Sequence, residues 1–121
     1  MEPLRILQTA TVLLAIAALG GVAMAGIRFS GKPHPPTWLA MLHGFLAAAA
    51  LTLLIYGWAT VGLPALAMAG TALFALAAAG GAALNLGYHW RRLPLPLGLM
   101  IGHAVLAVAG YVLLLVATLR G

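Results

Sequence analysis

The chain of 121 residues contains no cysteine and only one acidic residue, Glu2. Without cysteine there is no disulfide framework, no thiolate metal site and no iron–sulfur cluster. A single carboxylate side chain excludes catalysis by a carboxylate pair, and no Ser/His/acid set or Gly-rich phosphate loop is present. Charged residues make up only 6% of the chain, against about 25% in soluble domains, so water is not the main solvent of this protein.

Hydrophobic residues make up 64% of the chain and gather in four long runs. The runs cover residues 4–27, 38–58, 64–86 and 97–119, and each is close to the ~20 residues that a helix needs to cross a bilayer. Glycine and proline interrupt the chain between the runs, and Trp38 and Trp58 mark the two interfaces of the second. The sequence therefore predicts an all-α fold: a four-transmembrane-helix up-down-up-down bundle, a single membrane domain (1–121) surrounded by the lipid bilayer.

A shift of the sequence by 60 positions, without gaps, aligns rare residues as well as common ones. The aligned pairs include Gly20-Gly21 with Gly80-Gly81, Pro36 with Pro96, and His43 with His103. These matches indicate a tandem duplication of a two-helix hairpin, with repeats at 1–60 and 61–121. Because each repeat has an even number of spans, both insert the same way up, related by a pseudo-two-fold axis along the membrane normal. The repeat also favours a resident first span over a cleavable secretory signal, the other interpretation of Arg5 and the apolar stretch after it.

Basic residues lie at the ends of the apolar runs, which is typical of helix anchoring in a membrane and not of nucleic-acid binding. The two loops within the repeats carry four of them, Arg28, Lys32, Arg91 and Arg92, whereas the opposite side has Arg5 and Arg120. The positive-inside rule therefore predicts cytoplasmic repeat loops with both termini outside. We expect a multi-pass protein in a bacterial inner membrane.

The aligned histidines, His43 and His103, carry the strongest chemical signal. Each lies about seven residues into its span, or roughly 10 Å below the start of the helix. The second and fourth spans stand diagonally opposite in an up-down-up-down bundle, so we expect the two imidazoles at equal depth in the core. Two neutral imidazoles can fill both axial positions of one haem iron inside an apolar bundle. Hydrogen bonding between helices is the alternative that needs no cofactor.

The glycine pairs of the first and third spans, Gly20-Gly21 and Gly80-Gly81, fall at nearly the same depth as the histidines. Glycine lets backbone approach closely, so these pairs are expected to make space for a flat macrocycle, although close helix packing alone would also use them. The four basic residues of the repeat loops are expected to bind the haem propionates or to anchor the helices. Asn85, one helical turn beyond Gly81, would hydrogen-bond a propionate, a quinone or a neighbouring helix.

With His43, His103 and the two glycine pairs, the chain resembles the four-helix haem-binding bundle of the b-type cytochrome subunit in quinol-oxidising respiratory complexes. The resemblance implies one haem b, with His43 and His103 as the axial ligands and the glycines beside the porphyrin. The chain departs from that family about four turns further along, where a second haem would be ligated. Tyr56, Gly57, Val116 and Ala117 occupy those positions, so one haem is expected.

Electron transfer is the function that follows, in a protein without catalytic residues of its own. A membrane quinone and a redox partner protein at the loop face are the expected partners. Three alternatives stay open: a structural or assembly subunit without a cofactor, a small transporter or channel, and a bare metal site that His34 and His89 approach from the same side.

Overall fold

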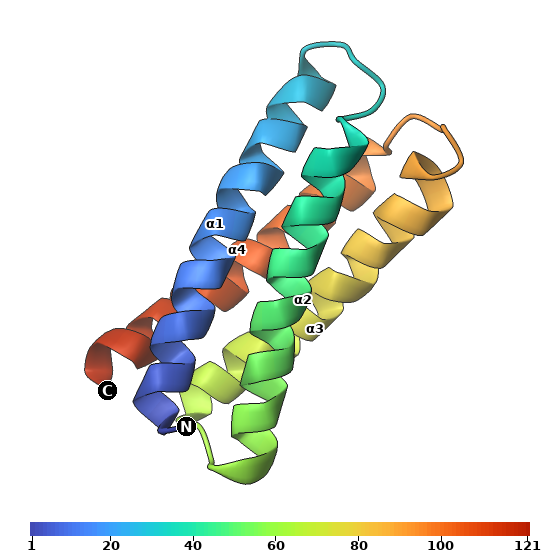
Figure 1. The fold of residues 1–121 in the computed structure, drawn as a ribbon. Helices are drawn as coiled ribbons and strands as arrows, with labels where there is room; N and C mark the ends of the chain where they lie inside the picture. Colours follow the sequence, from blue (N-terminus) through green and yellow to red (C-terminus); the bar gives the residue numbers. More distant parts are fainter.

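The computed structural model describes residues 1–121 and is built from helices alone. The helices are α1 (Pro3–Phe29), α2 (Thr37–Thr60), α3 (Ala65–Leu84), the short π-helix η1 (Asn85–His89) that continues α3, and α4 (Leu97–Arg120). They form an up-down-up-down bundle in which both termini lie at one end (Figure 1). The predicted all-α four-helix bundle is confirmed, and each predicted span agrees with the structure to within three residues.

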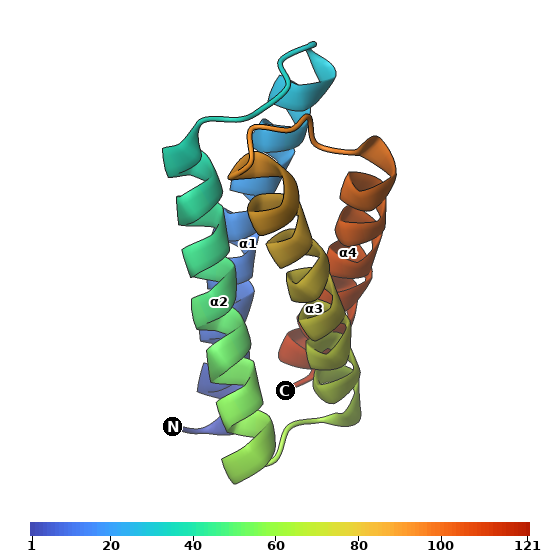
Figure 2. The same ribbon diagram turned by 90° about the vertical axis from the view of Figure 1, so that its right-hand side faces the viewer.

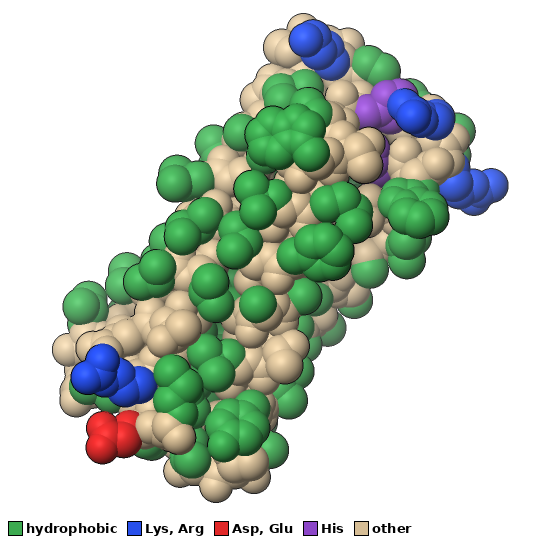
Figure 3. Space-filling model, viewed as in Figure 1, with side chains coloured by type: hydrophobic (Ala, Val, Ile, Leu, Met, Phe, Trp, Pro, Cys, Tyr) green, Lys and Arg blue, Asp and Glu red, His purple; other side chains and the backbone are tan.

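All four helices, with η1 counted as part of the third, are long and apolar enough to cross a membrane. The chain is therefore a multi-pass membrane protein. Most large apolar side chains that are exposed, such as Leu19 and Val105 at 72% and 61%, lie on the outer surface of the bundle and would contact lipid. Figure 3 shows this apolar surface between two ends that carry the charged residues.

Proline determines where the helices begin. Pro3 occupies the first turn of α1, and α2, α3 and α4 each begin at the residue after a proline, at Pro36, Pro64 and Pro96. A proline at the start of a helix removes no helical hydrogen bond, because the first backbone N–H groups of a helix have no acceptor within it. The short connection between α2 and α3 turns at Gly62, whose φ of +76° is one that residues with a Cβ rarely adopt.

The bundle consists of two hairpins, α1 with α2 and α3 with α4. The helices of each hairpin pack along one another, whereas the contacts between hairpins, α1 with α4 and α2 with α3, are much fewer. Helices α2 and α4 are diagonal to each other, as predicted, and Figure 2 shows α2 and α3 on the near side with α1 and α4 behind them.

Buried residues lie almost entirely in the half of the bundle that contains the termini. The last buried residue of α1 is Ala17 and that of α3 is Ala77, while the first of α2 is Ala50 and that of α4 is Gly110. The apolar core therefore closes the bundle near the termini. In the other half, which we call the loop half, no residue of α1 to α4 is fully buried.

Two hydrogen bonds tie the hairpins together at the loop end. Arg28 of the first hairpin donates from Nε to the carbonyl oxygen of Leu95 at 3.2 Å. His89 of the second donates from Nε2 to the carbonyl oxygen of Pro35 at 3.1 Å. Positions 35 and 95 are equivalent in the two repeats, so each loop accepts a bond from the other hairpin. The loop half is held by these polar ties where the other half has an apolar core.

Candidate functional site

His43 and His103 face each other in the loop half of the bundle. Their ring centroids are 6.1 Å apart and the ring planes meet at 74°. His43 comes from α2 and His103 from α4, and both rings are half-buried. The structure therefore places the two imidazoles next to each other, as the sequence led us to expect.

Each imidazole makes one hydrogen bond, and the two bonds are equivalent. Nδ1 of His43 donates to the carbonyl oxygen of Ala17, and Nδ1 of His103 donates to that of Ala77, both at 2.7 Å. A carbonyl oxygen only accepts, so Nδ1 carries the proton and Nε2 of the neutral ring carries the lone pair. Histidines that bind metals commonly have this arrangement, in which a bond from one nitrogen fixes the tautomer and orients the other.

The glycine pairs lie against these rings. A Cβ placed on Gly21 would stand 3.1 Å from Cε1 of His43, and one on Gly81 would stand 3.1 Å from Cε1 of His103. At Gly20 and Gly80 the nearest histidine atom is Cβ, at 3.6 and 3.7 Å, which is ordinary contact. The space that the glycines provide is thus occupied by the histidine of the same hairpin, and Gly21 and Gly81 are the two positions where a methyl group would press on the ring.

Both histidines line one cavity of about 200 Å³, which we call the imidazole cavity. Twelve of its fourteen lining residues are hydrophobic, so it suits an apolar ligand. Twelve of the fourteen also form pairs related by the 60-residue shift: Leu14 and Phe74, Ala17 and Ala77, Ala18 and Ala78, His43 and His103, Ala47 and Ala107, Leu51 and Tyr111. Both hairpins therefore build the cavity, mostly from equivalent positions, with six residues from the first and eight from the second.

The four basic residues of the loops do not line the imidazole cavity. Figure 3 shows basic side chains beside histidine side chains at the loop end of the bundle. Arg28 is engaged with Leu95, as described above, and Arg91 is exposed. Lys32 and Arg92 line a second cavity between the two loops, together with His34 and His89. The structure thus brings His43, His103 and the glycine pairs together, and places the basic residues in a separate group.

His34 and His89 form a pair of their own, with ring centroids 6.2 Å apart. No group of three or more histidine, cysteine or acidic side chains is close enough to hold a metal ion, so the structure does not gather the four histidines at one site. Asn85 lies next to His89, with Oδ1 3.3 Å from Nδ1 of that ring. Its partner is therefore this histidine.

Sequence reasoning missed the carbonyl groups of Ala17 and Ala77, which orient the two imidazoles. Alanine carries no chemical signal, but a histidine 26 residues beyond an alanine recurs in both repeats and could have pointed to them. No family model, curated protein or solved structure matches the chain, so the site is interpreted from its own geometry.

Proposed function

We propose that the protein is a small membrane b-type cytochrome that binds one haem between α2 and α4 and transfers electrons. The observation that carries the proposal is the matched pair of imidazoles, each held through Nδ1 by a carbonyl oxygen and each left with the Nε2 lone pair as its remaining donor. This is the donor set that haem iron accepts at its two axial positions.

The spacing of the rings supports the same proposal. A metal–nitrogen bond is about 2.0 Å long, and the centre of a five-membered ring with bonds of ~1.33 Å lies roughly 1 Å behind the bonded nitrogen. Two imidazoles on opposite sides of one metal would therefore have centroids about 6 Å apart. The observed separation is 6.1 Å. Little movement of the two histidines along the line that joins them would be needed.

A porphyrin needs more volume than the imidazole cavity has, since sites for organic ligands of this kind measure about 300–1,000 Å³ and the cavity measures about 200 Å³. The additional volume would come from a rearrangement of the loop half that keeps the two histidines at this separation; no residue of α1 to α4 is fully buried in this half. The packed core near the termini would hold the bundle together meanwhile.

Haem would supply a one-electron carrier, and the chain would supply its ligands and its apolar surroundings. His43 and His103 would hold the iron, and two histidine ligands would favour a low-spin state over the binding of gases. The donor and acceptor that we propose are a membrane quinone and a protein that docks at the loop end. The basic residues at that end, Arg28, Lys32, Arg91 and Arg92, would attract an acidic partner surface. Of these, Arg28 and Arg91 lie outside the second cavity and would pair with the haem propionates. We place that end in the cytoplasm of a bacterial cell.

The test is a reduced-minus-oxidised absorption spectrum of the protein after haem-replete expression. We expect sharp low-spin b-type bands that are lost or converted to high-spin in both His43→Ala and His103→Ala. The matched controls are His34→Ala and His89→Ala, which remove histidines at the same end of the bundle and should leave the bands in place. A colourless protein, or bands that survive both ligand substitutions, would refute the proposal.

A structural or assembly subunit without a cofactor is the second candidate. It is favoured by one observation: each imidazole already has a hydrogen-bond partner within its own hairpin, so the histidines also stabilise helix pairs. If this candidate is correct, we expect a colourless protein in which His43→Ala loosens the packing of α1 on α2 without any spectral change.

A further inference from the structure

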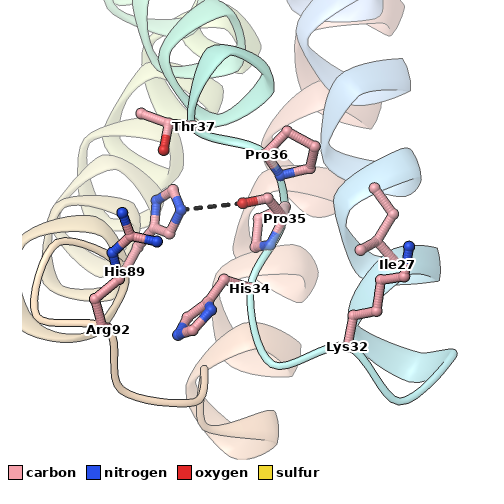
Figure 4. A pocket seen from close by; sticks show the side chains of 8 residues that line it. All are labelled: Ile27, Lys32, His34, Pro35, Pro36, Thr37, His89 and Arg92. Atoms are coloured by element: carbon pink, nitrogen blue, oxygen red, sulfur yellow. Dashed lines mark hydrogen bonds between the residues drawn. The ribbon is translucent and has the colours of Figure 1, made fainter.

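A second cavity, of about 340 Å³, lies between the two repeat loops. We call it the loop cavity; only one of its eight lining residues is hydrophobic, and its polar side chains are those of Lys32, His34, Thr37, His89 and Arg92. Figure 4 shows His34 on one loop facing His89 and Arg92 of the other hairpin. The loop cavity shares no lining residue with the imidazole cavity.

The loop cavity is lined by hydrogen-bond donors and positively charged side chains but by no acidic side chain. The only acidic residue of the chain, Glu2, lies at the opposite end of the bundle (Figure 3). Both ring nitrogens of His89 have a polar neighbour, because Nε2 donates to the carbonyl oxygen of Pro35 and Nδ1 lies 3.3 Å from the side-chain amide of Asn85. Nε2 of His34, in contrast, is buried and has no hydrogen-bond partner. A buried polar atom of this kind requires an explanation, and an acceptor in the loop cavity would provide one.

The loop cavity is where the two repeats stop resembling each other. In burial, positions 21–30 and 81–90 agree everywhere but at one pair, because Phe29 is 62% exposed and its equivalent His89 is 8% exposed. His34, likewise, corresponds to Pro94 in the second repeat. The imidazole cavity is lined mostly by equivalent residues. In the loop cavity, Lys32 and Arg92 are equivalent and both basic, whereas neither histidine has an equivalent histidine in the other repeat. A structural role for the loops common to both hairpins does not account for this.

The backbone that carries the second-repeat residues is also unusual. At η1 the α-helix changes to the wider π-helix, and His89, the last residue of η1, is buried. Short π-helical segments of this kind are frequent at functional sites. Three residues later Arg92 has a φ of +58°, and it is the only residue other than glycine with a positive φ. Non-glycine residues in this conformation cost free energy, and they cluster where ligands are held.

We propose that the loop cavity binds a phosphate group at the membrane interface. Lysine, arginine and a neutral histidine N–H together are the donors that phosphate oxygens accept, and arginine suits the planar, paired geometry of such contacts. The volume is that of about ten water molecules at ~30 Å³ each, which exceeds the needs of a bare halide and accommodates a phosphate with a small alcohol attached. The phosphate comes from the headgroup of an anionic lipid, which basic pockets between membrane helices bind, or from a soluble phosphate compound, which offers the same oxygen atoms.

The proposal is tested with the full chain in a neutral detergent, in buffer free of phosphate. Inorganic phosphate and phosphatidylglycerol are titrated in separate arms, with phosphatidylcholine as the zwitterionic reference, and the unfolding midpoint and native mass spectrum are recorded. The variants are His34→Ala and Arg92→Gln. The matched control is Arg91→Gln, which removes the adjacent positive charge from a side chain outside the loop cavity.

We expect the anion to raise the unfolding midpoint of the natural chain and of Arg91→Gln, with an apparent affinity at least tenfold weaker in His34→Ala and Arg92→Gln. Saturation by inorganic phosphate would assign a soluble ligand, and a response to phosphatidylglycerol alone would assign a lipid headgroup. If His34→Ala does not fold, His34→Gln retains a donor and should bind at intermediate strength.

Three results would overturn the proposal. One is the absence of binding in both arms, and another is an equal loss in Arg91→Gln and Arg92→Gln, which would mean general charge attraction. The third is loss of the site whenever haem is bound, which would assign the loop cavity to the haem carboxylates. A colourless protein that still binds phosphate would refute the proposed haem function and leave this one intact.

Discussion

At the scale of single residues, the two glycines of each pair differ in what they contact. A Cβ on Gly21 or Gly81 would press on the Cε1 edge of an imidazole, whereas one on Gly20 or Gly80 would meet no atom of the same histidine closer than its Cβ, at 3.6 or 3.7 Å. A ring fixed through Nδ1 to a backbone carbonyl cannot move away without lengthening that bond. The second glycine of each pair is therefore the one on which the position of the histidine depends.

Substitution of these glycines by alanine should separate the two roles. In Gly21→Ala and Gly81→Ala the new methyl group at 3.1 Å must displace the imidazole, and overpacking of this kind costs about 1–3 kcal/mol. We expect a lower unfolding midpoint and, if haem binds as proposed, a weaker low-spin spectrum. The controls Gly20→Ala and Gly80→Ala add a methyl group at ordinary contact distance and should keep both properties. Equal effects at all four positions would show that the histidines do not depend on this contact.

At the scale of helices, the two hairpins cross by different means. In the second hairpin, Gly70 of α3 meets Gly110 of α4, and a Cβ on either would stand 2.9 or 3.1 Å from the carbonyl oxygen of the other. The equivalent positions of the first hairpin are Ala10 and Ala50, which are fully buried. A contact between two glycines is therefore found at this point of the α3–α4 pair, where the α1–α2 pair has two alanines. Close approach through small residues is a principal way in which membrane helices associate.

The variant Gly110→Ala should consequently weaken the second hairpin. The obstacle is a backbone oxygen of another helix, which cannot rotate away as a side chain would, so we expect a loss of about 1–3 kcal/mol in unfolding free energy. Gly102→Ala is the control, because a Cβ there meets nothing within 4 Å. The measurement is the unfolding midpoint in detergent. An unchanged midpoint in Gly110→Ala would mean that α3 and α4 can separate without cost.

The four membrane helices could be predicted from sequence because their apolar runs and prolines are local signals. The π-helix η1 could not, since Asn85–His89 is compatible with an ordinary helix end. What distinguishes it is a set of bonds across the turn, such as Trp90 N–H to the Asn85 carbonyl at 2.8 Å, and the bond from His89 to Pro35 on the other hairpin. Contacts between residues 54 positions apart leave no local pattern in the chain.

The candidate site, like the fold, could be predicted from the sequence only in part. The 60-residue repeat and diagonal helices α2 and α4 were enough to pair His43 with His103, because the argument needs only position along a helix. The loop cavity depends on the conformation of two irregular segments. Sequence reasoning placed His34 and His89 on the same side of the bundle, but it could not predict that their rings lie 6.2 Å apart. The haem and the role of the basic loop residues toward its propionates stay predictions.

At the scale of the whole molecule, packing and charge divide the bundle into two ends. The apolar core lies near the termini, whereas the imidazole cavity and four of the six basic residues belong to the loop half. Figure 3 shows charged side chains at both ends of the bundle. A ligand that enters the loop half meets few apolar contacts that must be broken. It can therefore bind without unfolding the core, and binding should stabilise mainly the half that the core does not reach.

The orientation of these two ends in the membrane is open to a direct test, because the chain has no cysteine to interfere. Ser30→Cys places a thiol in the first repeat loop, and Val61→Cys places one in the exposed turn between α2 and α3 at the opposite end. Four basic residues at the loop end against two at the other favour cytoplasmic loops. In intact cells, a membrane-impermeant thiol reagent should therefore label Val61→Cys, and it should reach Ser30→Cys only after permeabilisation. The reverse pattern would place the loop cavity and any partner that docks there outside the cytoplasm, and labelling of both variants in intact cells would mean that the protein inserts in both orientations.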